Sequence, residues 1–362
     1  MLLNFLDGIR VRLRGIPPVP GDTPVEIARA VLRRNARRVL HSGAGHFKFL
    51  WVVDLAWALR GAEHALPREY LRNQIGHVLR ESGRLGRVPT CLRPARGFDM
   101  PYPRADGLPW LIHAVDEYAR FAGDRRLLDG ARPGLARLVA AWEREHLGED
   151  GLVRRSVAGD WMDTVLRPSS TYNNVCALMM AEKCRAIEVE SALDPERLSA
   201  RILESRFRAG AASDGEGRLT DHDGTEATGV DGAVVALYLG LFPRAVREAL
   251  AAHLEASDLV RPLPIRISTG PYDRRLLPLI SRLTPGYHAS TWLHMGLLYL
   301  NGLKRLGRDI SAHRARVDDL VLRHRNFLEC LDGRGEPYRT AFHATEYGLS
   351  MAAGQYLELA LS

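Results

Sequence analysis

The chain has 362 residues, of which 46% are hydrophobic and 26% charged, the usual mix for a globular protein with a large apolar core. The formal charge of +7 is modest and the arginines are spread along the chain, which argues against nucleic acid as a partner. The four cysteines form no C-x-x-C pair, and no stretch is apolar enough to predict a signal peptide or a membrane helix. We therefore expect a cytoplasmic protein with free thiols and no membrane partner, while its oligomeric state stays open.

Helical periodicity begins after an N-terminal extension of residues 1–23 and continues to the C-terminus. Amphipathic helices are predicted over residues 24–40, 67–82, 126–146, 194–209, 244–258 and 310–327. Between them lie segments that are apolar on nearly every side, over residues 46–61, 108–124, 172–190, 231–241, 290–303 and 347–361. No run of short alternating strands interrupts this pattern.

A helix that is apolar on every side must be enclosed by other helices. An inner ring of apolar helices wrapped by an outer ring of amphipathic ones satisfies this need. The sequence therefore predicts an all-α fold, an (α/α)6 toroid formed as a single domain by residues 24–362. The alternative is an α-solenoid of repeated helix pairs, but no repeat of fixed period supports it.

In such a toroid the loops at one end of the inner ring form a single funnel, and loops carry function more often than the core does. Four segments next to the predicted inner helices are rich in polar and aromatic residues: 97–110, 159–174, 284–294 and 329–339. These segments are the candidates for a sugar-binding site.

The segment with the clearest chemistry contains Asp160, Trp161 and Asp163, followed by Arg167. Cleavage of a glycosidic bond needs a carboxylic acid whose pKa an apolar neighbour has raised, and a tryptophan offers a flat face for a sugar ring. The same residues are also compatible with an ordinary capping aspartate beside a packing tryptophan.

The last segment places Glu329 at the end of a predicted helix, just before the Asp332-Gly333 turn. This position suits a carboxylate held over a cavity, but it also suits a solvated glutamate in a last helical turn. Asp54 is a charge within the apolar run FLWVVDLAWAL, so it either faces a polar cavity or pairs with an arginine. Ordinary packing or capping explains the remaining polar and aromatic residues of the four segments equally well.

The histidines form no H-E-x-x-H motif and no compact ligand set, so no metal is expected. The sequence also lacks a phosphate-binding loop and a nucleophile elbow, which argues against nucleotide-driven and serine-hydrolase chemistry. No cofactor is expected.

Taken in chain order, the segments resemble the inverting glycosidases of the (α/α)6 toroid: neutral/alkaline invertases, trehalases, processing α-glucosidases and the glucosidase half of glycogen-debranching enzymes. The similarity extends from about Phe47 to the C-terminus, and GDWMDTVLRPSSTYNNV is the best match. Further segments of the family are similar to FLWVVDLAWAL, RADGLPWLIHAVDEYARFAGD, Val230-Asp231-Gly232, GYHASTWLHMGLLYLNGL and FLECLDGRGEPYRTAFHATEYGLSMAAGQYLE. The chain departs from the family at three places. Val53 stands where the family has an arginine, Cys330-Leu331 where it has an aromatic pair, and Met351 where it has a tryptophan.

The resemblance implies that Asp163 is the general acid and Glu329 the general base, with Glu346 and then Glu336 as the next choices for the base. It also implies that further residues contact the sugar: Trp51, Asp54, Asp106, Trp110, Asp160, Trp161, Arg167, Tyr287, His288 and Trp292. The resemblance implies an α-glucoside or a sucrose-type sugar as the substrate. A short one is expected, because the compact chain lacks the usual N-terminal sugar-binding and lid insertions. One alternative is a sugar epimerase or lyase on the same toroid. An acid/base pair of histidines would indicate the epimerase. A non-catalytic helical sugar-binding or scaffold protein, marked by a cavity without paired acids, is the other.

Overall fold

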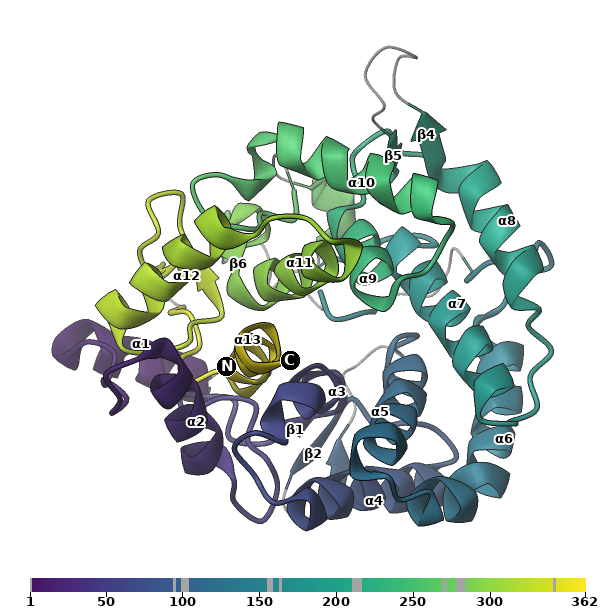
Figure 1. The fold of residues 1–362 in the computed structure, drawn as a ribbon, viewed down its shortest axis with the longest axis horizontal. Coiled ribbons are helices and arrows are strands. Elements are labelled where there is room, and N and C mark those ends of the chain that lie inside the picture. Colours follow the sequence, from purple (N-terminus) through teal and green to yellow (C-terminus); the bar gives the residue numbers. More distant parts are fainter. Residues whose placement is uncertain are drawn as a thin grey trace.

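The computed structural model describes residues 2–93, 96–98, 104–154, 159–162, 165–209, 217–268, 270, 272–277, 284, 286–340 and 343–362. Within these residues, α1 (Leu2–Arg14) is followed by helices that alternate between an outer and an inner ring (Figure 1). The outer helices are α2 (Pro24–Asn35), α4 (Arg68–Leu85), α6 (Arg126–His146), α8 (Pro195–Arg206), α10 (Arg244–Ala256) and α12 (Ser311–His324). The inner helices are α3 (Val52–Ala62), α5 (Gly107–Ala122), α7 (Thr171–Ala186), α9 (Val230–Leu239), α11 (Leu293–Leu306) and α13 (Ser350–Leu361).

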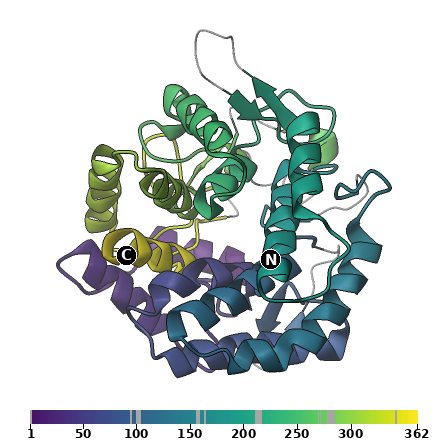
Figure 2. The same ribbon diagram turned by 45° about the vertical axis from the view of Figure 1, so that its right-hand side comes forward.

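The inner helices form a closed ring. Each packs against the next along the chain, and α13 completes the circle by packing against α3 (Figures 1 and 2). The first nine residues of α9 are all buried, whereas the outer helix α10 buries only Leu250, Ala251 and Leu254. This difference is the one that the sequence pattern predicted, and the expected all-α toroid is confirmed.

The ring closes through two glycines at the contact between α3 and α13. A Cβ atom on Gly61 would lie 1.7 Å from the carbonyl oxygen of Gly354, and one on Gly354 would lie 2.4 Å from the carbonyl oxygen of Ala58. Any larger side chain at these positions would force the two helices apart. Their close approach brings Asp54 of α3 and Met351 of α13 to the wall of one cavity.

A network of polar groups joins the C-terminal halves of the inner helices. Helix α5 contributes Asp116 and Glu117, and the other five inner helices contribute one residue each: Arg60, Lys183, Tyr238, Arg305 and Glu358. Arg60 lies 3.0 Å from Glu117, Arg305 lies 2.6 Å from Glu358, and the Tyr238 hydroxyl donates to Glu358 at 2.9 Å. Because these groups fill this end of the ring, the site is expected among the N-terminal ends of the inner helices.

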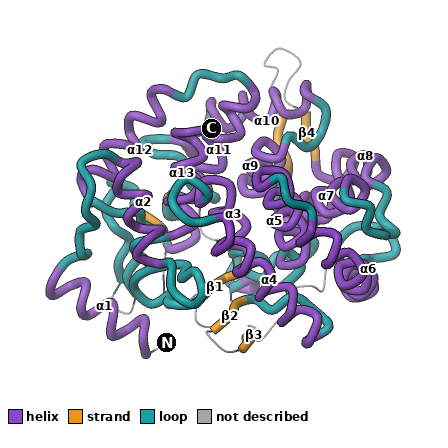
Figure 3. The backbone as a smooth tube through the Cα atoms, turned by 60° about the horizontal axis from the view of Figure 1, so that its bottom comes forward, coloured by secondary structure: helices purple, strands orange, loops and turns teal. Residues whose placement is uncertain are grey.

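The strands within the described residues are two or three residues long, and two of the three small sheets lie where inner helices begin (Figure 3). β1 (Leu50–Trp51) runs into α3 and pairs with β2 (Cys91–Arg93), which pairs with β3 (Arg96–Phe98). β6 (Thr291–Trp292) runs into α11 and pairs with β7 (Cys330–Leu331), so that Trp292 lies beside Cys330 and close to Glu329. The remaining pair, β4 (Phe207–Ala209) and β5 (Gly217–Leu219), lies after α8. The sequence did not predict these strands because such short segments show no alternation.

The N-terminal extension packs against the end of α12. The backbone N–H of Val19 donates to the carbonyl of Arg325 at 2.8 Å, and the Asn326 side chain donates to the carbonyl of Pro17 at 2.9 Å. The division at residue 23 stays a prediction. Across the described ranges, no helix has both the length and the apolar character that a membrane crossing requires.

Candidate active site

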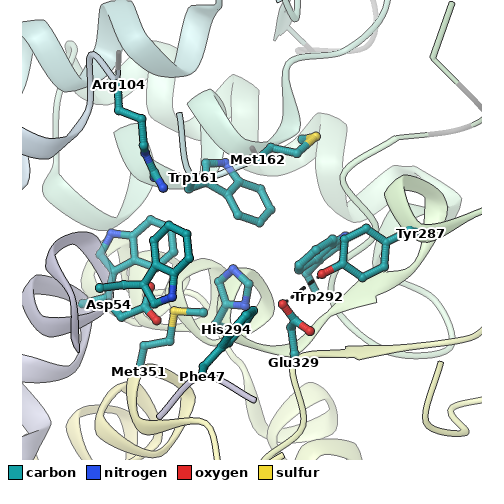
Figure 4. A pocket seen from close by; sticks show the side chains of 12 residues that line it. Phe47, Asp54, Arg104, Trp161, Met162, Tyr287, Trp292, His294, Glu329 and Met351 are labelled. Atoms are coloured by element: carbon teal, nitrogen blue, oxygen red, sulfur yellow. Dashed lines mark hydrogen bonds between the residues drawn. The ribbon is translucent and has the colours of Figure 1, made fainter. Parts of the chain in front are cut away.

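A cavity lies at the N-terminal ends of the inner helices (Figure 4). Six of the residues that the sequence singled out line it: Trp51, Asp54, Trp161, Tyr287, Trp292 and Glu329. Six others complete the described part of its wall: Phe47, Trp57, Arg104, Met162, His294 and Met351. Aromatic walls with a few convergent polar groups are typical of small-molecule sites.

Glu329 is a buried carboxylate in this wall, with 4% of its surface exposed. The Tyr287 hydroxyl donates to its Oε1 at 2.9 Å (Figure 4), and the backbone N–H of Glu346 donates to its Oε2 at 3.1 Å. Burial raises the pKa of Glu329 to about 7, although nearby His46 and the two hydrogen bonds favour the ionised form. A carboxylate with such a pKa is suited to exchange a proton near neutral pH.

Glu346 is buried behind the cavity and does not line it. Its carboxylate accepts hydrogen bonds from the backbone N–H groups of Gly45, His46 and Phe47, and the His46 ring nitrogen Nδ1 lies 3.0 Å away. These contacts fix the loop that places Phe47 in the wall. Glu346, the second choice for the base, therefore contacts this loop and not the cavity.

Asp106 and Trp110 also lie behind the wall. Asp106 is fully buried and accepts two hydrogen bonds from Arg104, from Nε at 3.0 Å and Nη2 at 2.8 Å. The Trp110 indole donates to the Tyr172 hydroxyl at 2.9 Å and so is part of the core. The residue that reaches the cavity from this segment is Arg104, whose guanidinium carbon lies 5.5 Å from the ring centre of Trp51.

Arg167 is the centre of a buried ion network that holds the segment around Trp161. Its guanidinium lies 2.8 Å from Asp160, 2.6 Å from Asp221 and 2.7 Å from Asp231. Asp231 also accepts the indole N–H of Trp161 at 2.9 Å, which orients that ring in the cavity wall. Burial, together with repulsion from Asp231, raises the pKa of Asp160 to about 7 despite the attraction of Arg167.

Asp160 and Arg167 thus lie behind the cavity and hold its wall. Asp163 lies outside the described residues, but its neighbour Met162 lines the cavity. His288 is buried against the rings of Tyr287 and Tyr272, and it does not contribute to the cavity wall.

Replacing Arg167 with methionine is expected to destabilise the fold by roughly 3 kcal/mol at pH 8, because three buried aspartates lose their shared cation. Burial raises the pKa of Asp160 to about 7, so its protonation removes one of the buried charges as the pH falls to 5, and the loss should shrink. Urea unfolding at both pH values measures this effect. Arg167→Lys keeps the charge and is the control, from which we expect a smaller loss; an Arg167→Met protein as stable as the wild type would contradict the assigned role.

Most of the residues that the sequence missed had a recognisable signal. Trp57 belongs to the same apolar run as Trp51 and Asp54, and Arg104 is two residues from Asp106. His294 is a histidine at the start of an apolar helix, two residues after Trp292. Their contribution to the wall depends on the rotation of each inner helix about its axis, which the pattern alone does not fix.

No family model matches the chain, and no curated protein matches it in sequence. Solved structures do match it in fold. A rhamnosidase from Klebsiella oxytoca with rhamnose bound matches with a TM-score of 0.65 and 12% identity over 94% of this chain. A glycosidase variant in complex with glucose matches with a TM-score of 0.67 and 14% identity over 93% of this chain. A GH63 mannosylglycerate hydrolase from Thermus thermophilus in complex with Tris and D-glycerate matches with a TM-score of 0.59 and 16% identity over 92%.

The chain has the toroid fold of these glycosidases. It spans 64% of the rhamnosidase, 95% of the glycosidase and 99% of the mannosylglycerate hydrolase. The resemblance to toroid glycosidases found in the sequence is therefore confirmed for the fold. Within the toroid, the cavity occupies the funnel at the N-terminal ends of the inner helices.

Proposed function

We propose that this protein is an inverting glycoside hydrolase with Asp163 as general acid and Glu329 as general base. The observation that carries the proposal is Glu329, a buried carboxylate with a pKa of about 7 in the wall of an aromatic cavity. Met162, next to Asp163 in the chain, lies across this cavity from Glu329 (Figure 4). The solved structures of this fold with rhamnose or glucose bound lend further support to a sugar as the ligand.

The proposed reaction is a single displacement. Protonated Asp163 donates its proton to the glycosidic oxygen, while ionised Glu329 removes a proton from a water molecule that attacks the opposite face of the sugar ring. The Tyr287 hydroxyl and the Glu346 N–H hold one Glu329 oxygen each, so they orient the carboxylate for this step. The indole of Trp161 offers a flat face to the ring.

The proposed substrate is a short α-glucoside or a sucrose-type sugar, acted on without a cofactor. A neutral sugar is compatible with a wall built from four tryptophans, a phenylalanine and two methionines. An epimerase is less favoured than a hydrolase, because the described part of the wall holds one histidine and not a pair.

The test is a panel of disaccharides and short α-glucans, with the released anomer followed by NMR. We expect an α-linked substrate to release the β-anomer first. Initial release of the α-anomer would exclude the inverting mechanism. Absence of turnover on every sugar would favour a non-catalytic binding protein.

A further inference from the structure

Four ring side chains in the cavity wall carry buried nitrogen atoms that have no hydrogen-bond partner among the described residues. These atoms are Nε1 of Trp51, Trp57 and Trp292, and both ring nitrogens of His294. Buried polar groups are almost always hydrogen-bonded, since leaving one unsatisfied costs about 1–3 kcal/mol. Five such atoms belong to side chains of one cavity wall, where a bound ligand can supply their partners.

The His294 imidazole is held firmly by its neighbours. It is 0% exposed and stacks on Trp57, with ring centres 5.3 Å apart and planes inclined by 25°. Trp161 and Trp292 approach it edge-on, at 5.1 Å and 5.6 Å. Figure 4 shows the imidazole between Met351 and Trp292. Because rings pack on three sides, the two nitrogen atoms have fixed directions.

This imidazole is uncharged at physiological pH. Burial lowers the pKa of His294 to about 3, so that one ring nitrogen donates a hydrogen bond and the other accepts one. A hydroxyl group can pair with either nitrogen, because it both donates and accepts. A carboxylate or phosphate only accepts, and it would leave the accepting nitrogen unsatisfied. The indole N–H groups of the wall complement hydroxyl oxygens in the same way.

We propose that His294 is a specificity-determining residue, whose imidazole binds a free hydroxyl group of a neutral sugar ring in the cavity. The cavity would then reject sugars in which that hydroxyl is missing or substituted. This inference rests on the proposed function in taking the cavity as the sugar site, but the binding itself needs no hydrolysis.

The kinetic test compares the α-glucoside that the wild type hydrolyses best with its four monodeoxy analogues. His294→Phe keeps the aromatic stack and removes both nitrogens, and we expect it to lower kcat/KM for the parent sugar about 100-fold, mainly through KM. One analogue should lack the hydroxyl that His294 binds. For this analogue, kcat/KM of the wild type should already be about 100-fold below its value for the parent sugar, and His294→Phe should lower it further by less than threefold. His294→Gln restores a donor and an acceptor and should recover part of the loss.

His113→Phe is the matched control, because it removes another buried neutral imidazole, packed 5.3 Å from the Trp110 ring and outside the cavity wall. It should leave kcat/KM unchanged. Thermal melting of all the variants shows whether each one folds. If removing each hydroxyl lowers kcat/KM by the same factor in the wild type and in His294→Phe, the role assigned to His294 is wrong. The observed hydrolysis would still support the proposed function.

A binding measurement separates this inference from the proposed reaction. Methyl α-D-glucopyranoside and its monodeoxy forms are titrated by ligand-observed NMR against the wild type and His294→Phe. If one hydroxyl is coupled to His294 in binding and no sugar is hydrolysed, the inference stands and the hydrolase proposal falls. If none of these sugars binds the wild type, the inference is overturned.

Discussion

Replacing Glu329 with glutamine is expected to lower turnover of the best disaccharide by about 10³-fold or more while the toroid stays folded. The amide cannot accept a proton from the attacking water, whereas its oxygen can still accept a hydrogen bond from Tyr287 or from the backbone of Glu346. Steady-state kinetics together with circular dichroism measure the two effects. Turnover near that of the wild type would remove Glu329 from the mechanism.

The wild-type pH profile checks the same assignment without a mutation. Because burial raises the pKa of Glu329 to about 7, the ionised base is lost below that pH, and kcat/KM should fall about tenfold per unit as the pH decreases further. A profile that stays flat down to about pH 4, the ordinary range of a glutamate, would point to another base.

The stability of Glu329→Gln should change in the opposite direction to its activity. A carboxyl whose pKa is raised in the folded state favours folding most when it is protonated, and this advantage is lost as the pH rises through about 7. At pH 8 the neutral glutamine avoids the buried charge, so the variant should be more stable by up to about 3 kcal/mol. The difference should fade toward pH 5. Thermal unfolding at both pH values measures it, and equal stabilities at pH 8 would contradict the burial argument.

Glu346→Gln is the matched control, because this second buried glutamate is close by but outside the cavity wall. Its carboxylate accepts from three backbone N–H groups, which an amide oxygen serves less well. We expect lower stability with activity kept within about tenfold. Loss of both turnover and the acid limb of the pH profile in this variant would make Glu346 the base.

The fold could be predicted from the sequence because the distribution of apolar residues around a helix depends on how much of that helix is buried. Helix α9 is apolar on every side and is enclosed, while α10 has one apolar stripe and lies outside. The predicted segment 126–146 coincides with α6, and the segment predicted from 347 begins as α13 at Ser350. The closure of the ring could not be predicted, since the contact between Gly61 and Gly354 joins positions far apart in the chain.

The candidate site could be predicted by segment but only in part by residue. The sequence favoured Asp106 as a sugar contact, yet a buried aspartate is stable only when paired, so it lies behind the wall and holds Arg104 toward the cavity. The same physics places Asp160 and Arg167 behind Trp161. In each segment a buried aspartate supports the wall from behind, and the cavity is lined by its partner Arg104 in one case and by its neighbour Trp161 in the other.

Asp163→Asn is expected to lower hydrolysis of a disaccharide by about 10³-fold, but hydrolysis of the corresponding glycosyl fluoride by less than tenfold. A sugar leaving group needs a proton from the acid as the bond breaks, whereas fluoride leaves with little help. The ratio of the two rates therefore reports on the acid alone, because Glu329→Gln should slow both substrates alike. Measuring kcat/KM for both substrates in both variants gives the ratio.

Asp160→Asn is the control for this assignment, since Asp160 is three residues away and buried against Arg167 at 2.8 Å. The asparagine oxygen can still accept from the backbone N–H of Met162, so we expect a modest loss that is the same for the disaccharide and the fluoride. If the fluoride is spared in Asp160→Asn and not in Asp163→Asn, the two aspartates have exchanged roles. The proton donor would then be the carboxyl whose pKa burial raises to about 7, and Arg167 would have to release it to reach the substrate.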